Sequence, residues 1–111
     1  MLIASRILKL RKGNDEIPIP IRIFAPVQAD GGSWFCHYEI DWPGENQRMD
    51  VGGADSMQAL VLALHIIGAV IYTSNYHKAG VLFFDAPDNG YGFPVVPTLR
   101  DLLQGDDTKY L

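Results

Sequence analysis

The sequence predicts an α+β domain, in which an antiparallel sheet of about four strands within residues 1–51 packs on one long, largely buried helix over 55–75. A C-terminal hairpin and short helix follow over 81–105. Apolar and polar residues alternate along the N-terminal half, as in half-buried strands, whereas the helix region has helical periodicity. The chain has 111 residues, of which 48% are hydrophobic. This length and composition fit a single domain, 1–111, with its own core.

Four segments in the N-terminal half have the pattern of β-strands. They cover residues 2–12, 17–25, 34–42 and 46–51, separated by the turn sequences Gly13-Asn14-Asp15, Asp30-Gly31-Gly32-Ser33 and Pro43-Gly44. In the second segment isoleucine alternates with Pro18, Pro20 and other residues, so one face is apolar. Both prolines lack a backbone donor on the same side of the strand, so we expect that side to be an unpaired edge.

The third and fourth segments form a hairpin in one of two registers. A two-residue loop places Glu39 opposite Arg48 and His37 opposite Asp50, and these opposite charges favour it. A longer loop suits Pro43 better, because L-proline does not fit the primed turns that two-residue hairpins prefer. Both registers place the same apolar side chains on one face, and both stay open at this point.

The long helix is the clearest element of the sequence. Asp55, with Gln58 three residues later, resembles a capping box at its start. The apolar stripe expected to lie on the sheet contains Met57, Leu60, Leu64, Ile67 and Ile71. Residues 56–77 include no charged side chain, so we expect the helix to be covered on both sides, by the C-terminal third, by a second subunit, or by both. Its apolar stretch is too short to span a membrane.

The C-terminal third is predicted to fold back over the helix. Residues 81–84 form a short buried strand, the Asp88-Asn89-Gly90 turn follows, and 91–95 form the return strand. Thr98 and Asp101 indicate the start of a short helix over 99–104, which Gly105 would end. Residues 106–111 are predicted to be a loose tail.

Charge is unevenly distributed along the chain. Four basic residues and no acidic residue lie within 1–12, which gives +4, while five basic and thirteen acidic residues lie within 13–111, which gives −8. The basic residues are Arg6, Lys9, Arg11 and Lys12. We expect them to pair with acidic surface of the same fold. Nucleic-acid binding through them is a weaker alternative, because the isoelectric point is only about 5.1.

No catalytic constellation, metal site or cofactor site is predicted. His37, Glu39 and Asp41 share one face of a strand, but alternate residues lie about 6.6–6.8 Å apart, too far for all three to bind one ion. Cys36 and His37 point to opposite faces of that strand, so they cannot act as a nucleophile–base pair. With one cysteine and no recognisable signal peptide, a cytoplasmic location is expected.

One group of residues suggests a small-molecule site near the C-terminal end of the long helix. Its members are aromatic side chains with or without polar tips and one histidine: His65, Tyr72, Tyr76, Tyr91 and Phe93. Small apolar pockets with a few polar groups are typical ligand sites. The same residues also fit a loop that simply covers the helix, or a subunit interface.

Several of these sequence features resemble a family of short bacterial proteins described as a domain of unknown function. The resemblance lies in Asp55-Ser56-x-Gln58-Ala59-Leu60, Ala63-Leu64, Ile67-Gly68, the Tyr72, Ser74 and Tyr76 group, Gly90-Tyr91-Gly92-Phe93-Pro94, Tyr38-Glu39-Ile40-Asp41-Trp42-Pro43 and Ala4-Ser5-Arg6. It covers about residues 3–105 and implies a stand-alone domain, with no catalytic residue to carry over.

The function expected from the sequence is that of a small cytoplasmic binding or protein-interaction domain. Its partner would be a second copy, giving a homodimer, or another protein. The alternative is a small-molecule-binding protein or enzyme that uses the aromatic group near the helix end. Whether the protein is an enzyme is left open.

Overall fold

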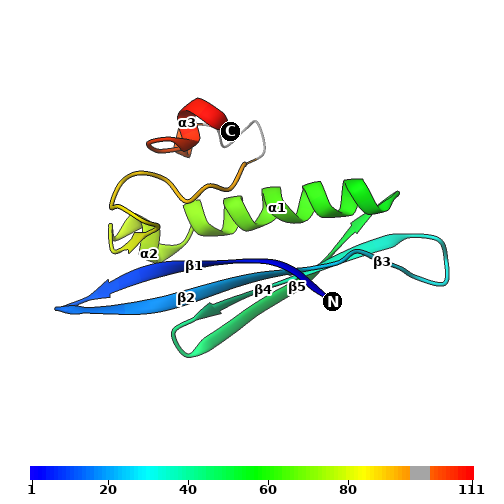
Figure 1. Ribbon diagram of the computed structural model, residues 1–111, viewed down its shortest axis with the longest axis horizontal. Coiled ribbons are helices and arrows are strands. Elements are labelled where there is room, and N and C mark those ends of the chain that lie inside the picture. Colours follow the sequence, from blue (N-terminus) through cyan, green and yellow to red (C-terminus); the bar gives the residue numbers. More distant parts are fainter. Residues whose placement is uncertain (96–100) are drawn as a thin grey trace. The chain divides into compact units, whose positions relative to one another are not determined.

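The fold in the computed structural model is α+β, as predicted: a six-stranded antiparallel sheet is packed with one main helix and short helices (Figure 1). The structure describes residues 1–95 and 101–111. Among these, no helix is long and apolar enough to cross a membrane.

Nine elements follow one another along the described chain. The strands are β1 (Leu2–Lys12), β2 (Asp15–Phe24), β3 (Val27–Gln28), β4 (Trp34–Trp42), β5 (Glu45–Gly53) and β6 (Leu82–Phe83). The helices are α1 (Ser56–Tyr72), α2 (Asn75–Lys78) and α3 (Asp107–Tyr110). The sheet order is β3-β4-β2-β1-β6, and β5 also pairs with β4. The four predicted N-terminal strands are therefore confirmed.

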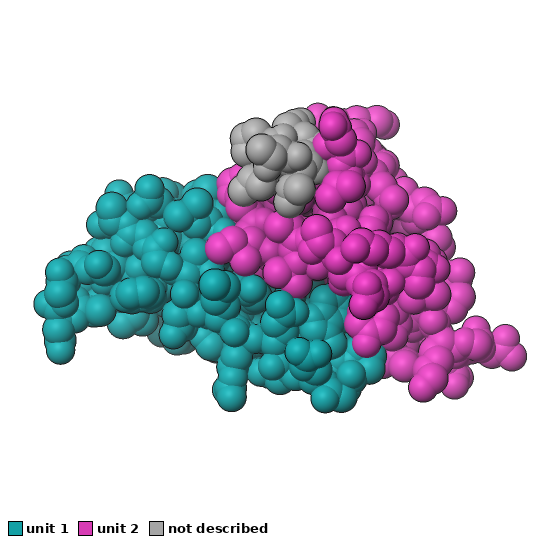
Figure 2. All heavy atoms as spheres, turned by 180° about the vertical axis from the view of Figure 1, so that it is seen from behind, with its two compact units in different colours: residues 1–6, 19–63 teal, residues 7–18, 64–111 magenta. Residues whose placement is uncertain are grey.

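The chain divides into two compact units, coloured teal and magenta in Figure 2. Unit 1 comprises residues 1–6 and 19–63, and unit 2 comprises residues 7–18 and 64–111. The buried side chains of unit 1 include Ile21, Cys36, Tyr38, Ile40 and Ala59; those of unit 2 include Leu8, Leu10, Ile67, Ile71 and Tyr91. The expectation that 1–111 is one domain stays a prediction.

The β4–β5 hairpin adopts the register with the two-residue loop. Trp42 pairs with Glu45, His37 with Asp50 and Glu39 with Arg48. The turn tolerates Pro43 because its φ is fixed at a negative value while Gly44 has φ 72°, the combination of signs found in a type II turn. Charge pairing thus predicted the register better than the usual turn preference did.

The two prolines of β2 lie beside the start of its pairing with β4. That register runs from Ile21 to Ile23, beginning directly after Pro20. This position agrees with the predicted unpaired edge at Pro18 and Pro20. The alternating isoleucines face the core, as expected, and Ile19, Ile21 and Ile23 are buried.

The start of α1 is capped as predicted, but the predicted core stripe is partly wrong. Asp55 Oδ1 accepts a hydrogen bond from the Gln58 N–H at 2.8 Å, and Gln58 Oε1 accepts one from the Ala54 N–H. Met57, expected in the core, has 68% of its surface exposed. Fully buried side chains of α1 instead recur every four residues, at Ala59, Ala63, Ile67 and Ile71. The first two of these residues are alanines because the helix backbone lies close to the end of β5. A Cβ added to Gly53 would come within 2.4 Å of the Ala59 nitrogen.

The helix ends at Tyr72, earlier than predicted, and a separate short helix follows. The Thr73 and Ser74 hydroxyls donate to the Ala69 and Ile71 carbonyls, and the Ser74 N–H also bonds the Ile71 carbonyl, three residues back instead of four, so the regular backbone ladder ends at Thr73. Ser74 then caps α2 by accepting a hydrogen bond from the His77 N–H. Two hydroxyl residues in succession therefore end one helix and begin the next.

Only the second half of α1 is closely covered by the segment that follows the 88–90 turn. Within unit 2 that segment lies so near the helix that a Cβ on Gly68 would be 1.9 Å from the Pro94 carbonyl oxygen. In the first half, Met57, Val61 and Leu62 remain exposed. These three side chains are thus not covered by the described parts of the chain, and cover by a second subunit stays a prediction.

The predicted C-terminal hairpin does not form. β6 pairs with β1, joining Phe83 to Lys9 and Leu82 to Leu10, and residues 91–95 are not a strand. Positive φ values at Gly90 and Gly92 interrupt the extended conformation that a return strand needs.

The last segment also differs from the prediction. The predicted helix start over 98–100 lies outside the described residues, while 101–102 lie in a 3₁₀ turn. Residues 107–110 form α3 rather than a loose tail, and Asp107 is buried, with only 3% of its surface exposed. Tertiary hydrogen bonds to Asp107, which the polar local sequence does not reveal, account for this difference.

Candidate functional sites

Two of the predicted ligand residues meet in unit 2. Tyr72, at the end of α1, and Tyr91 have ring centroids 5.1 Å apart, and His77 packs edge-on against both. Tyr72, His77, Tyr91 and Asp107 are called the aromatic–carboxylate cluster below. His65 and Tyr76 are half-buried and Phe93 is buried, and none of the three belongs to the cluster as defined.

Asp107 is the centre of this cluster. Its Oδ2 accepts hydrogen bonds from the Tyr72 hydroxyl at 2.5 Å and from the Tyr91 N–H at 2.9 Å, and its Oδ1 accepts one from the Gly92 N–H at 2.9 Å. The Tyr72 hydroxyl in turn accepts a bond from the Gln104 N–H at 3.2 Å. The sequence offers no local signal for Asp107, because an aspartate after Gly105 and Asp106 is typical of a solvated turn.

Tyr91 makes hydrogen bonds through both its backbone N–H, which binds Asp107, and its side-chain hydroxyl. The Tyr91 hydroxyl donates to the Leu82 carbonyl at 3.2 Å and lies 2.5 Å from His77 Nδ1. Burial is the main cause of a raised pKa at Tyr72, and it raises the pKa of Tyr91 to about 12. Burial also lowers the pKa of His77. Both phenols therefore stay protonated at neutral pH and serve as hydrogen-bond donors, whereas a general base needs a pKa near the working pH.

A hollow of about 200 Å³ lies beside Asp107. It is lined by polar residues and glycines with one aromatic side chain: Phe84, Asp85, Asn89, Gly90, Gly92, Asp106 and Asp107. The sequence predicts a pocket lined by aromatic side chains, whereas the one aromatic residue that lines this hollow is Phe84. The predicted pocket and the hollow therefore agree only in their general position. Four of the seven lining residues have polar or charged side chains, so a ligand in the hollow would meet several hydrogen-bonding groups.

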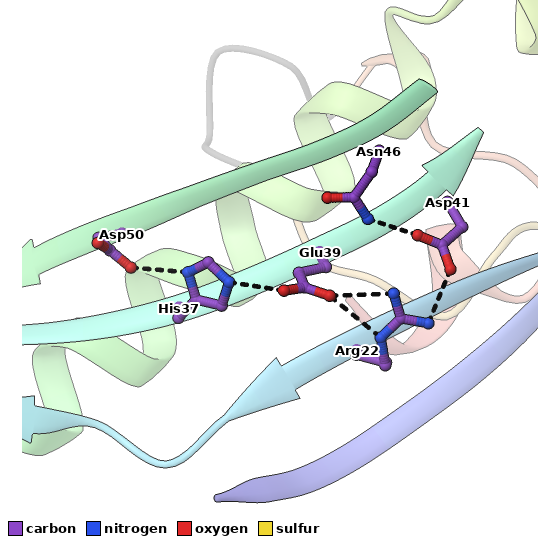
Figure 3. Close-up of polar contacts among 6 residues, drawn as sticks. All are labelled: Arg22, His37, Glu39, Asp41, Asn46 and Asp50. Atoms are coloured by element: carbon purple, nitrogen blue, oxygen red, sulfur yellow. Dashed lines mark hydrogen bonds and ion pairs between the residues drawn. The ribbon is translucent and has the colours of Figure 1, made fainter. Parts of the chain in front are cut away.

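A second group of polar residues lies on the outer face of the sheet in unit 1 (Figure 3). Arg22 of β2 binds two carboxylates of β4, with Nη2 3.0 Å from Glu39 Oε1 and Nη1 2.9 Å from Asp41 Oδ2. His37 lies between two carboxylates, 3.0 Å from Glu39 Oε2 and 2.7 Å from Asp50 Oδ1. The network links three strands, because Asp50 belongs to β5.

This polar network has the properties of a set of cross-strand pairs. Glu39 has an arginine opposite it on each side, Arg22 in the β2–β4 register and Arg48 in the β4–β5 register. The ion pair of Glu39 forms with Arg22. Hydrogen bonds from His37 and then Arg22 lower the pKa of Glu39, and the pKa of His37 is raised chiefly by its hydrogen bond to Glu39. Within the described part of the chain, no group of three or more potential ligands is arranged to hold a metal ion.

Cys36 is a core residue, as predicted. Its side chain is fully buried, its thiol donates to the Phe24 carbonyl at 3.3 Å, and burial raises its pKa. A protonated thiol without access to solvent is a poor nucleophile.

The basic residues of β1 do not form one basic surface. Lys9 Nζ lies 3.6 Å from Glu16 Oε2, which confirms the predicted pairing with acidic surface for this residue, and the Arg11 guanidinium lies over the Phe83 ring. Alternation along a strand directs Arg6 and Lys12 to the face opposite Lys9 and Arg11. Nucleic-acid binding through these residues stays an untested prediction, and their division between two faces does not favour it.

The first part of β1 forms an exposed edge. On the side of β6, the register covers only Lys9 and Leu10, so residues 2–8 lie beyond the strand pairing described on that side. Leu2, Ile3 and Ile7 have 50%, 46% and 55% of their surface exposed, although they are large aliphatic residues. An open strand edge with apolar side chains is a template for pairing with another chain.

Taken together, these features define an α+β domain with an open run on the edge of β1 and a buried carboxylate cluster. The chain belongs to the family described as Domain of unknown function (DUF6968), whose model matches residues 4–95. The expected resemblance to a domain of unknown function is thereby confirmed. Neither a curated protein nor a solved structure matches the chain.

Proposed function

We propose that this protein is a protein-interaction domain that binds through the open edge of β1, and that its partner is a second copy of the chain. The observation that carries the proposal is the open run of residues 2–8, with Leu2, Ile3 and Ile7 exposed. Backbone pairing along such an edge supplies affinity, and the side chains on either face supply specificity.

A contrast within the sheet supports this interpretation. Natural proteins protect open edges with proline, charge or a covering segment. β2 carries Pro18 and Pro20 beside its pairing with β4, whereas residues 1–12 contain no proline. The part of β2 that extends beyond β4 is thus blocked against pairing, whereas the open run of β1 keeps its backbone donors and its apolar side chains.

The length of the open run favours a second copy as the partner. Because β6 begins to pair at Lys9, the open run ends at Leu8, and the midpoint of 2–8 is Ser5. An antiparallel pair of identical strands centred on Ser5 uses the whole run and places Ile3 of one copy opposite Ile7 of the other. Such a twofold interface is self-complementary, as in most homodimers. The one charged residue of the run, Arg6, lies opposite Ala4.

A cysteine at the symmetry axis tests the proposal directly. Ser5→Cys should form a disulfide between two copies under mild oxidation, because paired Cα atoms of antiparallel strands lie about 4.5–5.5 Å apart and disulfides span about 4.4–6.8 Å. Ser33→Cys, exposed in a turn, is the matched control for random collision, and Cys36 is buried in both variants.

Light scattering over a range of protein concentrations provides the second measurement. The wild-type chain should dimerise, and the double substitution Ile3→Lys and Ile7→Lys should leave it monomeric, because lysines would lie opposite each other across the axis. Val27→Lys, at an exposed residue of β3, should keep the dimer. A wild-type monomer at every concentration, with Ser5→Cys cross-linking no faster than Ser33→Cys, contradicts the proposal.

The proposal includes a cytoplasmic location. The lone cysteine is reduced and buried in the core, which suits a compartment where thiols stay reduced.

A further inference from the structure

The strongest unassigned feature of the molecule is the set of hydrogen-bond donors that converge on Asp107. Two consecutive backbone N–H groups, those of Tyr91 and Gly92, bind one oxygen each, and the Tyr72 hydroxyl binds Oδ2 as a third donor. The donors come from α1 and from the turn after Asn89, whereas the acceptor comes from α3. All of them lie in unit 2.

The backbone of the turn is shaped to bind an anion. Gly90 and Gly92 have φ values of 84° and 78°, and Tyr91 lies between them. Successive N–H groups in such a turn point toward one concave side and form a nest for a negative charge. The Tyr72 hydroxyl adds a donor that stays protonated at neutral pH, because burial and its bond to Asp107 raise its pKa.

We propose that the Tyr91 and Gly92 N–H groups and the Tyr72 hydroxyl form a carboxylate-binding site, and that Asp107 fills it as an internal ligand that a free carboxylate can replace. The inference is independent of the proposed interaction through β1. It gives a role to Tyr72 and Tyr91, the two predicted ligand residues that the structure brings together.

The space around the site limits the ligand to a short carboxylate. The hollow of about 200 Å³ touches both Gly92 and Asp107, so it leads to the bound carboxyl group. A Cβ on Gly90 would lie 2.5 Å from the Asp107 carboxyl carbon, which leaves no space for a branched group on that side. Formate, acetate and an unbranched acidic side chain fit this description.

The charges around the hollow further restrict the ligand to a single negative charge. Asp85 and Asp106 also line it, and Asp106 is only partly offset by Lys109, whose Nζ is 3.9 Å from Oδ1. A second carboxylate on the ligand would meet these acidic groups. Like charges at close range oppose binding, so we expect monocarboxylates to bind better than dicarboxylates.

Chemical rescue of an emptied site tests the proposal. Asp107→Ala removes the internal ligand, and sodium formate should then raise its melting temperature more than sodium chloride at the same concentration, with saturation. The matched control is Asp106→Ala, which removes a neighbouring exposed carboxylate that does not reach the nest. Formate should act on that variant no more than chloride does.

A double variant identifies the donors. Adding Tyr72→Phe to Asp107→Ala should weaken formate binding roughly tenfold, the effect expected from losing one hydrogen bond to a charged group. If Asp107→Ala does not fold in chloride, the recovery of its near-ultraviolet circular dichroism in formate serves as the readout. Equal responses of Asp107→Ala and Asp106→Ala to formate, or no recovery of an unfolded Asp107→Ala in formate, would overturn the proposal.

A final comparison separates the two sources of a carboxylate. Acetate stands for a free metabolite, and aspartate blocked at both its amino and α-carboxyl groups stands for a side chain of a protein. Tighter binding of blocked aspartate assigns the site to an acidic protein segment, and tighter binding of acetate assigns it to a small acid. If neither stabilises Asp107→Ala more than chloride does, or if neither shifts the amide resonances of Tyr91 and Gly92 in the wild-type chain, where Asp107 must be replaced, the carboxylate site is contradicted.

Discussion

The two halves of α1 differ in what surrounds them, although their sequences look alike. Residues 64–72 lie in unit 2, where Pro94 closely approaches Gly68 and Asp107 binds Tyr72. Residues 56–63 lie in unit 1 and leave Met57, Val61 and Leu62 exposed. Both halves lack charged side chains. An uncharged helix face therefore does not by itself show that other described parts of the same chain cover the face.

The largest expected effect is a difference between the two halves in how much stability the protein loses when one side chain is truncated. Ile71→Ala should lower the free energy of unfolding by about 2–5 kcal/mol, because Ile71 is fully buried and its truncation leaves a cavity. Met57→Ala should change it by less than about 0.5 kcal/mol, because that side chain is mostly exposed. Urea unfolding of both variants measures the difference. Equal losses would show that Met57 is covered in solution.

A smaller effect compares two buried tyrosines, one in each unit. Tyr72→Phe should cost about 1–3 kcal/mol, because Asp107 loses a donor and the Gln104 N–H loses its acceptor. In Tyr38→Phe the hydroxyl lost is 3.9 Å from Met49 Sδ, a weak acceptor, so the cost should be below about 1 kcal/mol. Thermal unfolding measures the loss of stability in both variants. A larger loss for Tyr38→Phe would contradict the conclusion that the hydrogen bonds around Asp107 stabilise unit 2.

The smallest expected effect is an opposite pH response of two histidines. The hydrogen bond to Glu39, with Asp50 on the other ring nitrogen, raises the pKa of His37, so its contribution is present below about 6.5 and is lost as pH rises through the folded-state value. Burial lowers the pKa of His77, so its contribution is present above about 6.5 and is lost as pH falls.

Nuclear magnetic resonance titration of the two imidazoles measures these pKa values directly. His37→Gln should remove the decline in stability toward alkaline pH, and His77→Gln should remove the decline toward acidic pH. Shifts of the same sign at both residues would contradict the assignment. The groups that face His37 are Glu39, Asp50 and the Phe24 ring. His77 faces the Tyr72 and Tyr91 rings, and the charge of Asp88 opposes the effect of burial on its pKa.

Local patterns predicted the N-terminal half of the fold well. Alternation located the strands and the buried isoleucines of β2, and the pairs Glu39–Arg48 and His37–Asp50 indicated the hairpin register that forms. These predictions succeed because neighbouring strands are joined by short turns, so the sequence order of the residues determines which of them meet.

The candidate site was predicted only in part, because its partners are far apart in the chain. The sequence pattern indicates Tyr72 and Tyr91, but it predicts a loose tail around Asp107, whose bond to Tyr72 joins residues that are 35 positions apart. Likewise, Arg22 was not expected to bind Glu39, because that contact depends on the β2–β4 register. Side chains brought together by long-range packing leave no local pattern in the sequence.

The sequence by itself determined the α+β class, the four N-terminal strands and the capped start of α1, and it narrowed the β4–β5 hairpin to two registers, since each depends on interactions between nearby residues. The tertiary structure decided that β6 pairs with β1, that Asp107 is buried, and that Pro94 lies close against Gly68 in the second half of α1. These features depend on where distant segments pack. The free energy of burying a polar group such as Asp107 is favourable only when all of its hydrogen-bond partners are in place.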